Sequence, residues 1–231
     1  MTLTDSSTTG SRATGSPVHP DVDPDVQKLG IGMRLSIHPH SDNFVDVILG
    51  ALDDVAQAGL TDGLVVETDV VSTYVGARQK PAERSLAAYA SALIAAAHRR
   101  SGGHVVAHVL LSRGCPGEIS CERTEALAER AEVIDLEPTG IAANAQWSLY
   151  PLMDGGSPGT DHMVPIMAAI ERAKERGVAA SPAHYATLLT GDVSEVIATA
   201  TEAFLAVGTE VSHVVTHLTV SVGSPSEGAA A

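Results

Sequence analysis

The sequence predicts an α+β fold of two tandem ferredoxin-like (βαββαβ) repeats, each with an antiparallel sheet and its helices on one face. Three observations predict it: an internal duplication, short segments in which apolar residues alternate, and helical apolar stripes between those segments. The duplication is clearest between residues 104–118 and 213–227, which are identical at eight of fifteen positions without gaps. Similarity at a fixed offset indicates a repeated architecture, and two copies favour a pair of small units packed on each other.

The first repeat is predicted to contain four strands and two helices. Residues 33–38 alternate as a half-buried strand does, and a helix follows over about 43–58, with Ser41 or Asp42 as its cap and Gly59 at its end. Its apolar stripe comprises Phe44, Val47, Ile48, Ala51, Leu52 and Val55. Strands are expected at 64–67 and 70–75, a second helix from Pro81 through 86–98, and a last strand at 104–112.

The second repeat is predicted to follow the same order. Its strands are expected at about 146–150, near 178, at 184–189 and at 213–222, and its helices at 162–176 and 193–206. Because both helices of a repeat lie on one face, the other face of each sheet is left bare. We expect that face to be covered by the other repeat, by a second subunit or by a ligand.

The predicted domain boundaries follow from composition. Residues 1–29 are expected to be a disordered N-terminal segment, 30–118 the first repeat, 119–143 a linker, 144–226 the second repeat and 227–231 a tail. Within the linker, residues 122–132 are charged and permit one or two helical turns.

Charge and hydropathy exclude several classes of protein. The net charge of −14 argues against a nucleic-acid partner, and no apolar run is long enough for a membrane span. The N-terminus does not resemble a signal peptide, and two cysteines, Cys115 and Cys121, fit a reducing compartment, so a cytoplasmic protein is expected.

Ten histidines raise the question of a metal site. His104 and His108, like His213 and His217, are four residues apart on predicted strands, which separates them by about 13 Å and prevents chelation of one ion. No partner set with recognisable ligand spacing accompanies them, so no metal is expected. Nucleophile-elbow, phosphate-loop and dinucleotide motifs are also missing from the sequence.

Alternation places polar side chains on the predicted bare face. Arg34, Ser36 and His38 lie there in the first strand, and His104 and His108 in the last. Such a mixed face suits either sheet packing or a small polar ligand. Ser36 and Ser148 occur at equivalent places near a strand end that proline closes.

Several short motifs in a fixed order resemble the YkoF family. They are Leu35-Ser36-Ile37-His38-Pro39, Thr68-Asp69 with Ser72-Thr73, Gly114-Cys115-Pro116-Gly117-Glu118, Trp147-Ser148-Leu149-Tyr150-Pro151, His184-Tyr185-Ala186 and Gly191-Asp192. The resemblance extends from about residue 32 to 226. It implies a dimeric, non-catalytic protein that binds thiamine through its hydroxymethylpyrimidine (HMP) moiety and takes part in uptake of that precursor.

The expected ligand-binding residues combine these motifs with the chemistry of thiamine, a cation with an aminopyrimidine ring. Asp69 or Glu118 would accept from the exocyclic amine, Ser36 and Thr73 would supply hydroxyls, and aromatic rings, Tyr74 among them, would stack on the ligand. We expect the half that contains Asp69 to be the better cation site. The complete expected set is Arg34, Ser36, His38, Asp69, Ser72, Thr73, Cys115, Glu118, Trp147, Ser148, Tyr150, His184 and Tyr185.

The leading hypothesis is therefore a homodimeric binding protein for thiamine or HMP, without a cofactor, that serves salvage and has a transporter component as a further partner. An amino-acid-type effector-sensing module is the first alternative, because fold alone does not determine the ligand. An enzyme of the dimeric α+β barrel kind, with His38 or His108 as general base, is the second. A purely structural dimerisation protein is a third.

Overall fold

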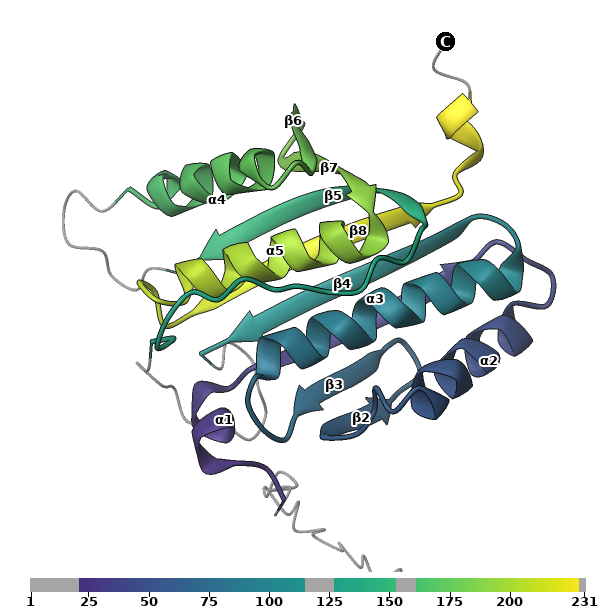
Figure 1. Cartoon of the computed structure of the whole chain (residues 1–231), viewed down its shortest axis with the longest axis horizontal. Coiled ribbons are helices and arrows are strands. Elements are labelled where there is room, and N and C mark those ends of the chain that lie inside the picture. Colours follow the sequence, from purple (N-terminus) through teal and green to yellow (C-terminus); the bar gives the residue numbers. More distant parts are fainter. Residues whose placement is uncertain (1–20, 115–126, 153–160, 229–231) are drawn as a thin grey trace, which may run out of the picture.

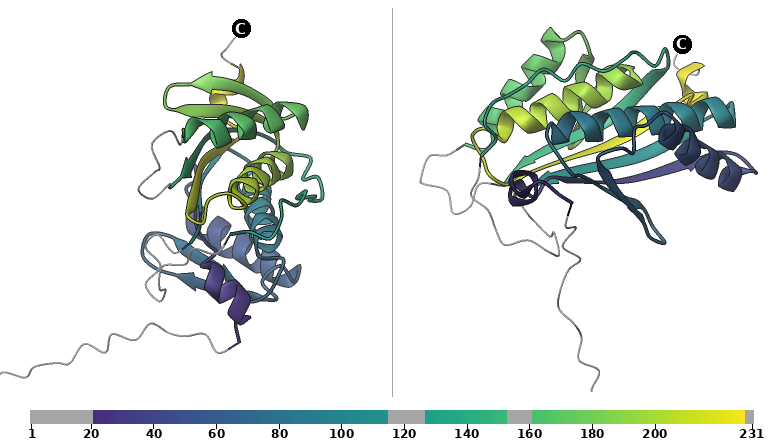
Figure 2. Two further views of the ribbon diagram at one scale, coloured as in Figure 1. Left: turned by 90° about the vertical axis from the view of Figure 1, so that its left-hand side faces the viewer. Right: turned by 60° about the horizontal axis from the view of Figure 1, so that its bottom comes forward.

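The computed structural model describes residues 21–114, 127–152 and 161–228. Its strands form one eight-stranded antiparallel sheet in the order β2-β3-β1-β4-β8-β5-β7-β6. All the long helices lie on one face of this sheet (Figures 1 and 2). The predicted α+β architecture of two ferredoxin-like repeats is confirmed.

The first repeat contains β1 (Gly32–Pro39), α2 (Phe44–Gln57), β2 (Leu64–Thr68), β3 (Thr73–Ala77), α3 (Ala82–Ser101) and β4 (Val105–Arg113). The second contains β5 (Ala142–Pro151), α4 (Met163–Glu175), β6 (Ala179–Ala183), β7 (Ala186–Asp192), α5 (Val193–Val207) and β8 (Val214–Val222). A short 3-10 helix, Pro225–Gly228, follows β8. In each repeat the third strand begins later than the sequence predicts, because a turn occupies residues 69–72 and 184–185.

The two repeats join edge to edge through β4 and β8. These strands are paired over nine registered positions, from Val105 opposite Val222 to Arg113 opposite Val214. The central helices α3 and α5 contact each other above this seam, and a single apolar cluster runs through both repeats. The expectation that one repeat covers the other repeat's bare face is therefore wrong, because the repeats extend one sheet instead of stacking.

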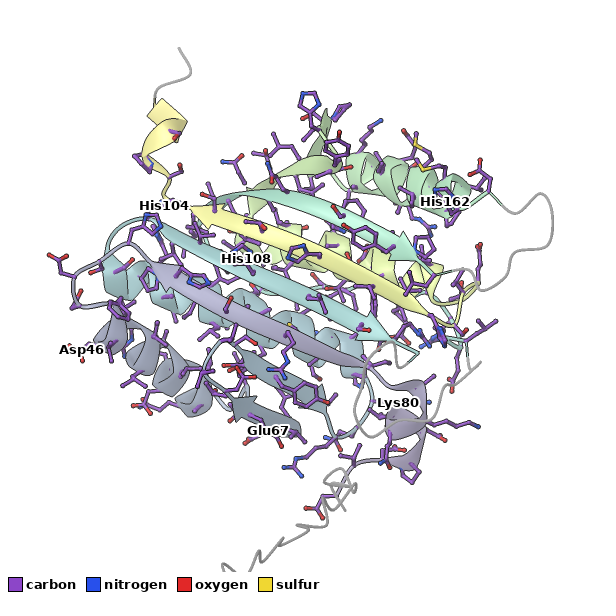
Figure 3. The ribbon with its side chains drawn as sticks, turned by 180° about the vertical axis from the view of Figure 1, so that it is seen from behind. Asp46, Glu67, Lys80, His104, His108 and His162 are labelled. Atoms are coloured by element: carbon purple, nitrogen blue, oxygen red, sulfur yellow. The ribbon has the colours of Figure 1, made fainter. Side chains whose placement is uncertain are left out.

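The face opposite the helices carries the predicted polar side chains (Figure 3). In β4 the side chains of Val105, Ala107, Val109 and Leu111 are buried, whereas His108 and Leu110 are exposed. In β1 the side chains of Arg34 and His38 are exposed on the same face. Alternation thus assigned the two faces correctly, because successive side chains of a strand point to opposite sides.

Part of the segment predicted to be disordered is a helix. α1 (Pro24–Leu29) begins with Asp23, whose carboxylate accepts from the Asp25 backbone N–H at 2.8 Å. It ends at Gly30, which adopts the left-handed conformation with φ 56°. Val26 is buried in the core, so this short helix gains apolar contacts that local composition did not reveal.

The predicted linker helix is not formed over residues 127–132, and its earlier part lies outside the described residues. The chain here runs along α5 instead. The Ala128 N–H donates to the Gly208 carbonyl, and Ile134 is buried with its N–H on the Glu202 carboxylate. These contacts to α5 replace the hydrogen bonds that a local helix would supply.

Among the described residues, we find no helix with both the length and the apolar character that crossing a membrane requires.

Candidate functional site

Each repeat contains a gap in the sheet at the same place. Pairing of β1 with β3 ends at Leu35 opposite Thr73, although β1 continues to Pro39. Pairing of β5 with β7 ends at Trp147 opposite Thr187, although β5 continues to Pro151. Beyond these points the strand edge faces a helix and a hairpin turn, and a pocket lies between them.

The first pocket has a volume of about 320 Å³. It is bounded by the end of β1, by α2 and by the β2–β3 turn. Five of the predicted ligand-binding residues line it, namely Ser36, His38, Asp69, Ser72 and Thr73. The structure therefore brings together residues that are more than thirty positions apart in the sequence.

Asp69 organises the turn beside this pocket. Its Oδ1 accepts from the backbone N–H groups of Val71 and Ser72 at 2.8 and 2.9 Å. Its Oδ2 accepts from Arg34 Nη1 at 2.5 Å, and the same Nη1 donates to Ser72 Oγ at 3.2 Å. The hydrogen bonds from Ser72 and Val71, and then Arg34, lower the pKa of Asp69 to about 2. The carboxylate is thus an anion already paired with a cation.

Arg34 itself lies at the rim, outside the lining of the first pocket. Its guanidinium carbon is 6.0 Å from the centre of the Tyr74 ring, and both side chains belong to the bare face of the sheet. Tyr74 therefore does not contribute a wall to this pocket, contrary to the expectation that it would stack on the ligand. Phe44 of α2 is the aromatic side chain that does line it.

Ser36 and His38 connect the pocket with the bare face. Ser36 Oγ lies 3.0 Å from His38 Nε2. Partial burial, together with the neighbouring imidazoles of His108 and His40, lowers the pKa of His38. His38 is therefore held in its neutral form near pH 7, in which one ring nitrogen is able to accept a hydrogen bond.

The second pocket occupies the equivalent place between β5, α4 and the β6–β7 hairpin, with a volume of about 600 Å³. Four predicted residues line it: Trp147, Ser148, Tyr150 and Tyr185. Trp147 is only 2% exposed, and its Nε1 donates to Thr216 Oγ1 at 2.8 Å. This bond fixes the indole ring as an apolar wall while satisfying its polar group.

Tyr185 lies at the tip of the β6–β7 hairpin with φ 63°, a conformation that is unfavourable for a side chain of this size. Its ring is fully exposed, and its carbonyl lies 3.4 Å from Ser148 Oγ. His184, also predicted to bind ligand, lies exposed in the same turn but outside the lining of the pocket.

Sequence reasoning missed the contribution of the first helix of each repeat. Phe44, Ile48 and Leu52 of α2 line the first pocket. The corresponding residues of α4 line the second: Met163, Ile166, Met167, Ile170 and Lys174. The sequence predicted the apolar stripe of α2 but not which part of it faces a pocket. Phe44 is 50% exposed, and only Val47, Ala51 and Val55 are buried. These apolar stripes are wider than the part of each helix that is buried, and this width was the sequence signal that could have revealed the pocket walls.

Two predicted residues, Cys115 and Glu118, lie outside the described residues. Within the described part of the chain, no group of three or more His, Cys, Asp or Glu side chains is placed to hold a metal ion.

The chain is similar to proteins of one known family. A profile described as "YKOF-related Family" matches residues 142–227, which is the second repeat. A Bacillus subtilis (strain 168) protein named "Putative HMP/thiamine-binding protein YkoF" is 29% identical over 198 residues, covering 84% of this chain and 91% of that protein. The resemblance that the sequence motifs predicted is confirmed.

Proposed function

From this relationship to the YkoF family, we propose that the chain is a non-catalytic binding protein for thiamine and its HMP moiety. The observation that carries the proposal is the pair of equivalent pockets, each opening onto an unpaired strand edge. Their volumes fall in the range of about 300–1,000 Å³ that is typical of small-ligand sites.

The strand edge provides the chemistry that an aminopyrimidine needs. Beyond Leu35 and Trp147, alternate residues of β1 and β5 turn a backbone N–H and C=O toward the pocket. A donor beside an acceptor complements a ring nitrogen beside an exocyclic amine. The recurring hydroxyls of Ser36 and Ser148 flank this edge and are able to donate or accept.

The walls of the pockets are suited to flat rings. Trp147, Tyr150 and Tyr185 surround the second pocket, and thioether side chains of Met163 and Met167 complete it. Aromatic faces attract cations, so these rings suit a thiazolium as well as a pyrimidine. Both methionines and both tyrosines are exposed, and clustering of exposed apolar side chains marks a site of interaction.

The two pockets differ, and we assign them different ligands. Asp69 of the smaller pocket is already paired with Arg34, so it offers little net negative charge to a thiazolium. The second pocket is larger and richer in aromatic side chains. We therefore assign whole thiamine to the second pocket and the pyrimidine moiety to both, which differs from the expectation that the Asp69 half is the better cation site.

Uptake or salvage of the vitamin precursor in the cytoplasm is the role that we propose for this binding. A homodimer formed through the bare face, and delivery of the ligand to or from a transporter, belong to the same proposal. Catalysis is not part of the proposal. The Ser36 hydroxyl lies 3.0 Å from His38 Nε2, but the charged neighbours that affect His38 are the imidazoles of His108 and His40 and not a carboxylate that would orient it as a general base.

Trp147 allows the proposal to be tested pocket by pocket, because it is the single tryptophan of the chain and lines the second pocket. Thiamine and HMP would each be titrated while heat and tryptophan fluorescence are recorded. We expect saturable heat for both ligands and a fluorescence change that follows occupancy of the second pocket alone.

Two matched variants separate the pockets. Met167→Arg places a charge in the second pocket from a half-exposed helix position, and Phe44→Arg does the same in the first. Met167→Arg should abolish the fluorescence response, whereas Phe44→Arg should preserve it. No binding of either ligand at millimolar concentration would overturn the proposal, and saturation by amino acids instead would favour the effector-sensing alternative.

A further inference from the structure

The β2–β3 turn, residues 69–72, forms one wall of the first pocket. All four of its residues line that pocket, together with apolar side chains of α2. Val70 and Val71 occupy the tip of the turn, and their side chains are 102% and 79% exposed. The position of this turn therefore determines the width of the pocket.

Two adjacent valines are unusual at the tip of a hairpin. Tight turns favour Gly, Asn, Asp and Pro, whereas β-branched residues favour strands. Neither valine contributes to the core, because both side chains extend into solvent. Phe44, which lines the same pocket, is also half exposed. Exposed apolar side chains that cluster around a pocket mark a site of interaction, and here a bound ring would cover them.

Arg34 holds this turn from outside the pocket. Its Nη1 donates to Asp69 Oδ2 at 2.5 Å and to Ser72 Oγ at 3.2 Å, so that one guanidinium contacts both ends of the turn. Within the turn, the Asp69 N–H donates to the Ser72 carbonyl at 3.0 Å, and Asp69 Oδ1 accepts from two further N–H groups. Because Arg34 does not line the pocket, these contacts position the wall without touching a ligand.

The ion pair between Arg34 and Asp69 is better suited to positioning than to stabilising the fold. Both side chains are about half exposed, and ion pairs in such places contribute little to the free energy of unfolding. The pair does restrict the conformations of the turn. A binding site that is ordered beforehand gains affinity, because less conformational entropy is lost when the ligand binds.

The equivalent ion pair cannot form in the second repeat. In the duplicated sequence, Gln146 corresponds to Arg34 and Ala183 corresponds to Asp69. The β6–β7 turn instead contains Tyr185 in a conformation with φ 63°. A turn that is held by opposite charges is therefore a property of the first pocket.

We propose that Arg34 is a positioning residue, which holds the β2–β3 turn as a preformed cap so that Val70 and Val71 contact the pyrimidine ring in the first pocket. This inference rests on the proposed function of the pocket. It adds two ligand contacts, Val70 and Val71, and it gives Arg34 a role that acts through Asp69 and Ser72.

The test is calorimetry of the first pocket in the Met167→Arg background, with HMP as the ligand. HMP lacks the thiazolium charge of thiamine, so it separates positioning from electrostatic attraction. Arg34→Gln should weaken HMP binding several-fold, and Arg34→Lys should retain more of the affinity, because an ammonium group is also able to pair with Asp69. If Arg34 acted only through its charge, Arg34→Gln would leave HMP binding unchanged and strengthen thiamine binding. That result would overturn the proposal.

A double-mutant cycle identifies the route by which Arg34 acts. In the Asp69→Ala background, Arg34→Gln should have little further effect on HMP affinity, because the partner that transmits its effect has been removed. Effects of the two substitutions that simply add would contradict a role through Asp69.

The two valines are tested by substitution to serine. Val70→Ser and Val71→Ser should each weaken HMP binding several-fold and leave the free energy of unfolding almost unchanged, because both side chains are exposed. Val45→Ser is the matched control. It removes a half-exposed valine of α2 that does not line the pocket, and it should bind HMP as the parent does. Parent-like affinity in both turn variants would exclude the proposed contacts.

Amide hydrogen exchange without ligand tests the turn independently of vitamin binding. Arg34→Gln should speed the exchange of the Val71 and Ser72 N–H groups several-fold. Arg99→Gln, which removes the same charge from an exposed helix position, should not. Equal exchange in Arg34→Gln and the parent overturns the positioning role. Failure of HMP to bind the parent would instead refute the proposed function and the valine contacts, while faster exchange in Arg34→Gln would still support the role of Arg34 in the turn.

Discussion

Val109 and Leu218 are equivalent positions of the two repeats and are also direct partners across the β4–β8 seam. The equivalence follows from the duplicated sequence, in which His104 corresponds to His213 and each later residue to its counterpart. A residue that pairs with its own counterpart lies on a local two-fold axis. The two repeats are therefore related by a rotation about this point of the sheet.

This axis determines where the two ligand pockets lie. Each pocket adjoins the first helix of its repeat, and α2 and α4 lie at opposite corners of the sheet (Figure 1). The pockets do not share a lining residue. We therefore expect them to bind independently, with affinities set by their different side chains.

The charge of Asp69 and its role in the turn can be separated by substitution. Asp69→Asn keeps an oxygen for the Val71 and Ser72 N–H groups, whereas Asp69→Ala removes the acceptor. Asp69→Ala should weaken binding in the first pocket by at least several-fold, and Asp69→Asn by less. Calorimetry in the Met167→Arg background measures the first pocket alone. If both variants and the parent bind the ligand with equal affinity in the first pocket, Asp69 is not part of the binding site.

The depressed pKa of Asp69 also predicts a pH dependence. Its contribution to stability is complete above the ordinary aspartate pKa of 3.8 and disappears as the pH falls toward 2, because protonation breaks the ion pair and the turn contacts. Arg34→Gln should raise the pKa only in part, since the backbone N–H donors remain. Carboxyl NMR shifts of Arg34→Gln recorded between pH 5 and 1.5 measure the pKa of Asp69. A full return of this pKa to 3.8 would show that Arg34, and not the backbone N–H donors, is the main cause of the shift.

Tyr185 should contribute to binding but not to folding. Because its φ is positive, Tyr185→Gly should leave the free energy of unfolding unchanged or raise it, while Tyr185→Ala retains the unfavourable conformation. Both should weaken thiamine binding several-fold in the fluorescence titration, since both remove an exposed aromatic ring that borders the second pocket and that a bound ligand would cover. Tyr185→Phe should bind as the parent does. A loss of affinity in Tyr185→Phe would assign the role to the hydroxyl instead.

Asp192 is predicted to be structural, although it belongs to a motif of the family resemblance. Its Oδ1 accepts from the Ser194 N–H as the N-cap of α5 and from the Thr139 N–H, and its Oδ2 accepts from the Ile141 N–H. Asp192→Ala should cost about 1–2 kcal/mol for the lost cap, with a further loss from the released connector. Chemical denaturation measures the free energy of unfolding of each variant, and Asp192→Asn should lose less of it than Asp192→Ala.

The same carboxylate predicts acid sensitivity. Partial burial opposes ionisation of Asp192, but hydrogen bonds from Ser194 and Thr139 outweigh it and hold the pKa below its usual value. Its contribution to stability is therefore present at neutral pH and is lost as the pH falls below the usual aspartate range. The stability of Asp192→Ala should vary less with pH in this window than that of the parent.

A row of three imidazoles crosses the centre of the bare face. The ring centroids of His38 and His108 are 5.5 Å apart, and those of His108 and His217 are 6.2 Å apart. Partial burial and the charge of His108 lower the pKa of both His38 and His217. The contribution of His38 and His217 to stability should thus be complete above about pH 6.5 and fall as the pH drops below it, because these two side chains resist protonation in the folded protein. His108→Gln should reduce this fall, and the exposed His184→Gln should not.

The same face is where we expect a second copy to bind. Leu110 is 38% exposed at the centre of the sheet, between Arg34 of β1 and His217 of β8. Leu110→Glu should convert a dimer into a folded monomer, which sedimentation velocity and circular dichroism would show together. A parent chain that sediments as a monomer at micromolar concentration would contradict the dimer.

The duplicated sequence determined the kind, order and inward faces of nearly all the elements. Periodicity carries that information locally: apolar residues recur at every second position in β1 and at every third or fourth in α2. It also placed Ser36 and Ser148 at equivalent strand ends. The helix α1 and the extended chain at 127–141 escaped this reasoning, because contacts with distant core residues stabilise them.

Only the tertiary structure decided how the repeats join and where the pockets form. The edge-to-edge pairing of β4 with β8 left the bare face uncovered, and no local pattern distinguishes it from stacking of two sheets. The pockets arise because β3 and β7 stop short of the ends of β1 and β5, so that helices approach the free strand edges. Each of these features is a long-range contact, which a one-dimensional pattern does not encode.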